Sequence, residues 1–325
     1  MSKLAETAPS ASLTRKIYLA APRGFCAGVD RAIEIVERAL QVYGTPLYVN
    51  HEIVHNSHVV NQLTERGVVF VNQLSEVPNG STVIFSAHGV APQLWKQAEA
   101  RNLEIIDATC PLVTKVHIEA KRYARENYNM VLIGHKNHVE AIGTYGEAPD
   151  KITIIETEEE VEDLSYPENS KLAFITQTTL SIRDTQGIIA RLKQKFPQIE
   201  GPKSSDICYA TTNRQEAVAS LAAKVDLILV IGSQNSSNST RLKELAEKMG
   251  TRAFLIDNAE VIDPEWISSD VNNIGITAGA SAPEILVEQV MERLKTDFGF
   301  KSTEELRVKD EDVVFQLPKV LRDIS

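Results

Sequence analysis

The sequence has 325 residues, of which 43% are hydrophobic and 24% charged, so it has the composition of an ordinary globular protein with a substantial core. A net charge of −10 argues against nucleic acid as a partner, because nucleic-acid binding depends on clustered Lys and Arg. No apolar run approaches the roughly 20 residues that span a bilayer. Residues 1–15 are small and polar, without the apolar stretch of a secretory signal, and are predicted to be a disordered tail.

The first third of the chain alternates strand and helix patterns. The stretch 17–40 reads as an apolar strand, a Pro/Gly-rich turn that holds Cys26, and an amphipathic helix. A β-rich run then reaches His55, and a helix pattern follows that ends at Gly67. Two more strand patterns follow, the second of which ends at His88. Alternation of this kind predicts parallel sheets covered by helices.

The middle third repeats the alternation. Cys110 ends an apolar strand and precedes a helix pattern. A later strand breaks at Gly134 into a polar loop with His138 and Glu140, and another strand leads to Thr178. Ser181 is predicted to cap the helix that follows.

In the last third, Cys208 again precedes a helix, whose N-cap we expect among Thr211, Thr212 and Asn213. A buried strand then opens into a loop dense in hydroxyls and amides, and these donors at a helix start suit a phosphate. The loop residues of interest are Ser236, Ser237 and Asn238. A further strand leads to Ser281, which stands at capping-box spacing from Glu284.

The three cysteines therefore share one setting, between a strand and a helix. The positive end of a helix dipole and its free N–H groups are expected to lower the pKa of a thiol there, which suits a thiolate ligand or a nucleophile. Taken alone, each cysteine could equally be a small buried hydrophobe. An odd number of cysteines argues against a disulfide framework and favours a reducing compartment, so we expect a cytoplasmic protein.

The spacing of these residues indicates a repeat. The gaps between the cysteines are 84 and 98 residues, and a polar residue follows each cysteine after 28 or 29 residues, namely His55, His138 and Ser236. A second polar residue ends a later strand in each third, namely His88, Thr178 and Ser281. We predict an α/β fold of three similar units with mainly parallel sheets, in a pseudo-threefold (trefoil) arrangement around one site. The predicted bounds are 16–108, 109–206 and 207–300, followed by a C-terminal segment, 301–325.

Convergence of the three units would bring together three thiolates, three histidines, one carboxylate and a ring of hydroxyls. Three cysteines could bind zinc with a histidine as fourth ligand, although the short spacings usual in structural zinc sites are absent. They could also hold a 4Fe-4S cluster, leaving one iron open for a substrate oxygen. Histidines and hydroxyls at helix starts would suit an anionic ligand such as a diphosphate, and Glu140 would be the proton source.

Eight segments in order resemble one known family, and together they cover nearly the whole chain from Ile17 onward. The segments are PRGFCAGVDRAI, HEIVHN, FSAHGV, DATCPLVTKVH, TQTTLS, DICYATTNRQEA, GSQNSSNSTRL and TAGASAPE. They are similar to the IspH/LytB family of 4-hydroxy-3-methylbut-2-enyl diphosphate reductases.

The resemblance implies three α/β domains around one 4Fe-4S cluster per chain, with Cys26, Cys110 and Cys208 as its ligands. It implies Glu140 as the proton-delivering carboxylate, beside Thr178. It also implies a set of substrate and diphosphate contacts: His55, His88, His138, Thr178, Ser236, Ser237, Asn238 and Ser281.

The activity implied by the resemblance is the reductive dehydroxylation of 4-hydroxy-3-methylbut-2-enyl diphosphate. The products are isopentenyl and dimethylallyl diphosphates, in the last step of the methylerythritol phosphate (non-mevalonate) route. The implied electron donor is ferredoxin or flavodoxin. One departure from the family pattern is Val139, which stands where a proline is usual, between His138 and Glu140. The alternatives are an iron-sulfur hydro-lyase, which would need no reductant, and a non-catalytic iron-sulfur sensor.

Overall fold

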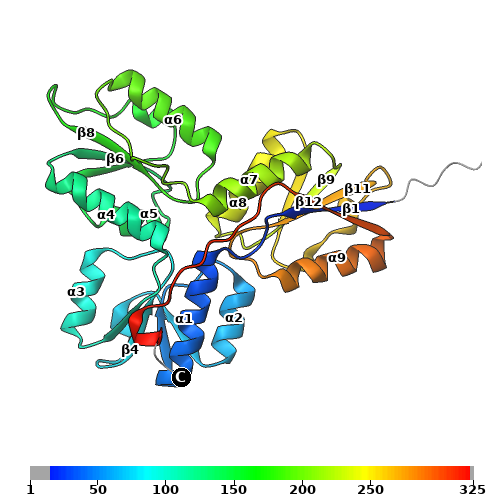
Figure 1. The fold of residues 1–325 in the computed structure, drawn as a ribbon, viewed down its shortest axis with the longest axis horizontal. Helices are drawn as coiled ribbons and strands as arrows, with labels where there is room; N and C mark the ends of the chain where they lie inside the picture. The colour runs from blue at the N-terminus through cyan, green and yellow to red at the C-terminus, as the bar shows by residue number, and fades with distance from the viewer. Residues whose placement is uncertain (1–14, 323–325) are drawn as a thin grey trace, which may run out of the picture.

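Three parallel sheets, each with helices on both faces, form three lobes around a common centre (Figure 1). The structure is a computed structural model and describes residues 15–322. All nine strand pairings between named strands are parallel. The predicted α/β trefoil is therefore confirmed. The predicted disordered tail lies, apart from Arg15, outside the described residues.

The first lobe contains a four-stranded sheet with the order β3-β2-β4-β5. Its strands are β2 (Leu47–Asn50), β3 (Val68–Val71), β4 (Thr82–Phe85) and β5 (Glu104–Asp107). Its helices are α1 (Ala27–Tyr43), α2 (Ser57–Glu65) and α3 (Pro92–Ala100), with a 3₁₀ turn, η1 (Leu74–Glu76). Side chains of α1 and α2 join one buried cluster and side chains of α3 join another, so both faces of this sheet are covered.

The second lobe contains a three-stranded sheet with the order β7-β6-β8. Its strands are β6 (Asn129–Ile133), β7 (Ile152–Ile155) and β8 (Leu172–Thr176). Its helices are α4 (Pro111–Arg125), α5 (Val139–Tyr145) and α6 (Ile182–Lys195), with η2 (Glu159–Val161). The predicted cap of α6 is confirmed, because the Ser181 side chain accepts a hydrogen bond from the backbone N–H of Asp184.

The third lobe contains a five-stranded sheet with the order β10-β9-β11-β1-β12. Its strands are β1 (Lys16–Ala21), β9 (Leu227–Ile231), β10 (Arg252–Ile256), β11 (Asn273–Ala278) and β12 (Ser302–Arg307). Its helices are α7 (Tyr209–Ala222), α8 (Ser237–Lys248) and α9 (Glu284–Phe298), with η3 (Ala259–Val261) and η4 (Pro264–Trp266). The last helix of the chain, α10 (Lys319–Arg322), lies apart from this lobe.

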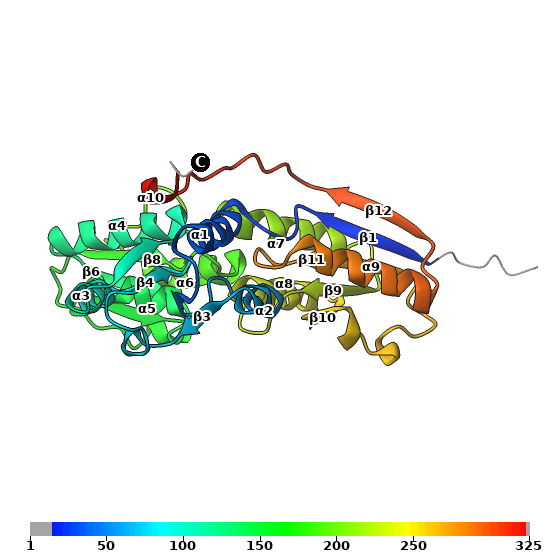
Figure 2. The same cartoon turned by 90° about the horizontal axis from the view of Figure 1, so that it is seen from below.

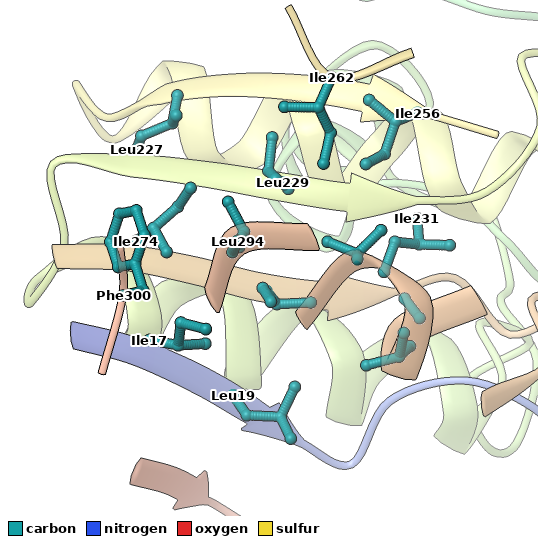
Figure 3. Close-up of a cluster of buried hydrophobic side chains, with 14 of the residues drawn as sticks. Ile17, Leu19, Leu227, Leu229, Ile231, Ile256, Ile262, Ile274, Leu294 and Phe300 are labelled. Atoms are coloured by element: carbon teal, nitrogen blue, oxygen red, sulfur yellow. The ribbon is translucent and has the colours of Figure 1, made fainter. Parts of the chain in front are cut away.

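Strand β1 departs from the predicted bounds, which placed it in the first unit. It lies in the third sheet, between β11 and β12, and Ile17 is opposite Ile274. Ile17 and Leu19 pack into the buried cluster beneath α9 (Figure 3), whereas Ala20 packs into the cluster under α7 and α8. A strand buried on both faces needs neighbours on both edges, and the third sheet supplies them.

The C-terminal segment also differs from the prediction, which placed it after the third unit as a separate part of the chain. Its first part, β12, completes the third sheet, and the chain then crosses to the first lobe, where α10 ends beside α1 (Figure 2). Leu317 and the fully buried Leu321 pack into the cluster that α1 shares with the first sheet. This crossing segment, residues 308–322, therefore ties the third lobe to the first.

No helix within residues 15–322 is long and apolar enough to cross a bilayer.

We expect Leu229→Ala to lower the free energy of unfolding by about 2–5 kcal/mol, because the Leu229 side chain is fully buried in the core of the third lobe. Val261→Ala in the same lobe is the matched control, because the Val261 side chain is 49% exposed, and it should change stability by no more than about 0.5 kcal/mol. Urea titration of both variants measures the difference. Equal effects of the two substitutions would contradict this assignment of the core.

Candidate functional site

One cavity lies where the three lobes meet, and every predicted site residue lines it. The cavity encloses about 760 Å³ of space, its open mouth included. The predicted residues on its wall are Cys26, Cys110, Cys208, His55, His88, His138, Glu140, Thr178, Ser236, Ser237, Asn238 and Ser281. Sequence reasoning did not anticipate other wall residues, among them Thr179, Tyr209 and Phe315.

Each cysteine is the N-cap of the helix that follows it: Cys26 of α1, Cys110 of α4 and Cys208 of α7. The prediction of a cap at Thr211 or its two successors was wrong, because those residues already lie inside α7. Cys208 caps that helix itself, and its sulfur accepts a hydrogen bond from the backbone N–H of Thr211 at 3.4 Å. All three thiols are free.

The expectation of lowered thiol pKa values was also wrong for the protein alone. Burial raises the pKa of Cys110 to about 12 and that of Cys208 to about 11, and it raises the pKa of Cys26 as well. Backbone N–H groups at the helix starts act in the opposite direction, but removal of the thiols from water is the larger effect. A thiolate at these positions therefore needs a positive partner in the cavity.

Three histidines form a second group on the wall. The rings of His55 and His88 stack with centroids 4.1 Å apart, and His138 stands edge-on to both, at 5.5 and 5.9 Å. Burial lowers the pKa of His138 to about 3 and that of His88 well below its usual value, and the neighbouring His55 adds to both shifts. Burial therefore favours the neutral form of these two rings, and a bound anion would favour their charged forms.

Hydrogen bonds orient these rings. The Nδ1 atom of His138 accepts the backbone N–H of Glu140 at 3.2 Å, so the proton of the neutral ring is on Nε2. The Nδ1 atom of His55 lies 2.9 Å from Glu52 Oε2, and Asn235 donates to the same carboxylate at 2.8 Å. Sequence reasoning missed Glu52 and Asn235, and the only available signal was their position beside predicted site residues.

Glu140 is held by Thr178. The carboxylate accepts the backbone N–H of Thr178 at 2.6 Å on Oε1 and its hydroxyl at 3.0 Å on Oε2. Glu140 is only 3% exposed, and burial raises its pKa to about 7 against the lowering effect of the two Thr178 bonds. A carboxyl group with this pKa holds and releases a proton near neutral pH. The expected contact with Thr178 is confirmed, and Val139 is the first residue of α5.

Hydroxyls and an amide line the cavity at the start of α8. Ser236 caps α8, and its hydroxyl lies 3.3 Å from that of Ser281. Asn238 accepts the backbone N–H of Ala280 at 2.9 Å, which joins α8 to the loop after β11. The predicted capping box at Ser281 was wrong, because the cap residue of α9 is Pro283. Ser281 instead donates to the backbone carbonyl of His55 at 2.9 Å and so links the third lobe to the first.

Other charged and metal-binding side chains do not extend this site. His117 pairs with Glu147 and His135 with Glu156, and neither histidine lines the cavity. Within residues 15–322, no group of three or more His, Cys, Asp or Glu side chains is arranged to hold a single metal ion.

Comparisons with known proteins give a consistent result. The family model described as LytB protein matches residues 17–295. The chain is 57% identical over 312 residues to 4-hydroxy-3-methylbut-2-enyl diphosphate reductase from Chromohalobacter salexigens, covering 95% of this chain and 98% of that protein. It is 55% identical over 311 residues to the protein of the same name from Acinetobacter baylyi, covering 94% and 98%.

Solved structures agree with these sequence relatives. The structure of the E-1-hydroxy-2-methyl-but-2-enyl-4-diphosphate reductase from Plasmodium falciparum is similar with a TM-score of 0.92 and 42% identity, covering 95% of this chain and 97% of that one. A second structure has a TM-score of 0.62 and 35% identity, covering 86% and 99%. Its protein is described as (E)-4-hydroxy-3-methyl-but-2-enyl diphosphate reductase, the terminal enzyme of the non-mevalonate pathway.

Proposed function

The chain belongs to the LytB family and is a reductase of 4-hydroxy-3-methylbut-2-enyl diphosphate in the non-mevalonate pathway, and we propose that the cavity between its three lobes is the active site. The overall change is a reductive dehydroxylation, in which two electrons and two protons enter and the hydroxyl leaves as water. The products are isopentenyl and dimethylallyl diphosphates. The observation that carries the proposal is that three thiols, three histidines and Glu140 line one cavity.

We assign to Cys26, Cys110 and Cys208 the role of holding one 4Fe-4S cluster per chain. The wall between two of the thiols supports this assignment. A Cβ atom added to Gly28 would lie 2.7 Å from the Cys110 sulfur and 3.8 Å from the Cys26 sulfur, so only a glycine leaves the space between them clear. When bound, the cluster supplies electrons to the substrate. Its positive irons would be the partners that the three buried thiolates need.

The histidines and hydroxyls are assigned to the substrate's diphosphate. The Nε2–H of His138 is a donor that no protein acceptor uses within the described residues, and it belongs to a ring on the cavity wall. Ser236, Ser237 and Asn238 place polar groups on the cavity wall at the start of α8, where the helix dipole favours an anion. His55, His88 and Ser281 are assigned to the same group, and no Lys or Arg is among the residues that line the cavity.

Glu140 is assigned the delivery of a proton to the substrate. Its carboxyl group is buried in the cavity wall, and with a pKa of about 7 a large fraction is protonated at neutral pH. Thr178 fixes both carboxyl oxygens, so the proton is held at a defined position beside the substrate.

The electrons must come from outside the chain, and we propose ferredoxin or flavodoxin as the donor. A reducing compartment keeps three unpaired thiols available for a cluster, so we propose the cytoplasm as the place of action.

We expect Glu140→Gln to keep the cluster and bind substrate, and to lose turnover by about 10²–10⁴-fold, because glutamine cannot deliver a proton. In the wild type the rate of the protonation-limited step should fall about tenfold per pH unit above about pH 7, as Glu140 ionises, and this fall should be absent from the variant. Single-turnover rates between pH 6 and 9 measure both effects. Glu156→Gln, outside the cavity, is the control and should keep the turnover of the wild type. Full turnover by Glu140→Gln would contradict the assignment of Glu140 as the proton donor.

We expect Gly28→Ala to fold normally and to lose most of its iron, because the added methyl group would contact the Cys110 sulfur. Alanine favours a helix by about 1 kcal/mol over glycine, so reduced helix stability cannot explain the loss. The measurements are iron per chain and far-UV circular dichroism of anaerobically purified protein. A variant with the iron content of the wild type would show that this space is not needed for the cluster.

A further inference from the structure

Each of the three helices that a cysteine caps carries a cation just over one turn from its start. Arg31 follows Cys26 by five residues, Lys115 follows Cys110 by five, and Arg214 follows Cys208 by six. None of these cations lines the active-site cavity, and the proposed reaction does not use them. Their hydrogen bonds nevertheless follow one pattern.

Arg31, on α1, binds the residues directly before the second cysteine. Its guanidinium donates to the backbone carbonyl of Thr109 at 3.0 Å and to that of Ala108 at 3.3 Å. It also donates to the carbonyl of Gln316 at 2.8 Å, in the crossing segment. Arg31 therefore joins the helix capped by Cys26 to the loop that carries Cys110.

Lys115, on α4, makes the corresponding contacts before the third cysteine. Its Nζ donates to the backbone carbonyls of Ser204 and Ser205, both at 3.0 Å, and to Asp206 Oδ1 at 3.2 Å. Asp206 in turn accepts the backbone N–H of Thr176 at 3.0 Å, which anchors the loop on β8. Lys115 therefore joins the helix capped by Cys110 to the loop that carries Cys208.

Arg214, on α7, makes the corresponding contacts before the first cysteine. Its guanidinium donates to the carbonyl of Gly24 at 2.7 and 3.0 Å and to that of Phe25 at 3.1 Å, directly before Cys26. The side chain is fully buried, and Glu311 of the crossing segment supplies the opposite charge at 3.0 Å. A buried arginine persists only when it is paired and its donors are satisfied, and both conditions hold here.

We propose that these three cations form a closed ring that positions the three cysteines for one cluster. We call Arg31, Lys115 and Arg214 the cation ring. The cation on the helix of each cysteine fixes the loop before the next cysteine, and the cation after the third cysteine fixes the loop before the first. The inference rests on the proposed function, since it concerns the spacing of the cluster's ligands. The three are positioning residues, because they act on the cysteines through the backbone.

The ring meets a physical need of the trefoil. The three cysteines cap helices of three different lobes, so no single sheet or helix sets the distances between them. A cation that binds backbone carbonyls from a neighbouring loop fixes that distance with charge-assisted hydrogen bonds. Arg31 and Arg214 also interact electrostatically with Cys110 and Cys26, and positive charge beside a cluster's ligands stabilises its reduced, more negative form.

Lys115 is the best member to test, because 36% of its side chain is exposed, whereas Arg214 is fully buried. We expect anaerobically purified Lys115→Gln holoenzyme to release iron to a chelator about tenfold faster than the wild type, the lower limit usual for partners behind metal ligands. Its midpoint potential, from a redox titration followed by electron paramagnetic resonance, should differ from that of the wild type, because displacement of the loop that carries Cys208 changes the surroundings of the cluster. Lys115→Arg, which keeps the charge and the carbonyl contacts, should restore both properties to wild-type values.

Arg125→Gln is the matched control, because it removes one positive charge from the exposed end of the same helix. Iron release and potential that are the same in Lys115→Gln and Arg125→Gln, with a full cluster in the wild type, would overturn the ring and leave the proposed function standing. A wild-type protein without iron and sulfide would overturn both.

Discussion

Convergence of three helix starts on one cavity is the constraint on which the rest of the structure depends. Each lobe presents the carboxyl ends of its parallel strands toward the centre, and a cysteine caps the helix that begins there. Because burial holds these thiols in their neutral form, the protein alone does not stabilise thiolates. The same cavity is lined by the histidines, hydroxyls and Glu140, so the proposed cluster and the substrate would meet there.

The elements around this centre differ in how far they can be predicted from sequence. Apolar strands followed by a polar residue are local signals, so the cysteines at helix starts could be predicted, as could His88 and Thr178, although these two lie two or three residues beyond the ends of β4 and β8 rather than in the strands. The regular spacing of these residues predicted that they converge on one site, because repeated units place equivalent residues at equivalent positions. The roles of the individual residues came from the family resemblance, because neither spacing nor burial distinguishes a substrate contact from a structural side chain.

What sequence reasoning missed depends on long-range contacts. β1 joins strands more than 250 residues away, and no local pattern identifies its neighbours. The crossing segment has no helix or strand before α10, yet it supplies Glu311 to the buried Arg214. Ser281 stands at capping spacing, but the chain caps α9 with Pro283 and uses the serine across a lobe boundary. The thiol pKa was predicted in the wrong direction because burial, a property of the whole fold, outweighs the local helix dipole.

The most direct test of the account is the metal and sulfide content of the protein purified without oxygen, with its visible spectrum before and after addition of 4-hydroxy-3-methylbut-2-enyl diphosphate. The account predicts about four irons and four acid-labile sulfides per chain, and a spectrum that changes when substrate binds. One zinc ion per chain without sulfide would contradict it, because the three thiols would then form a site of a different kind.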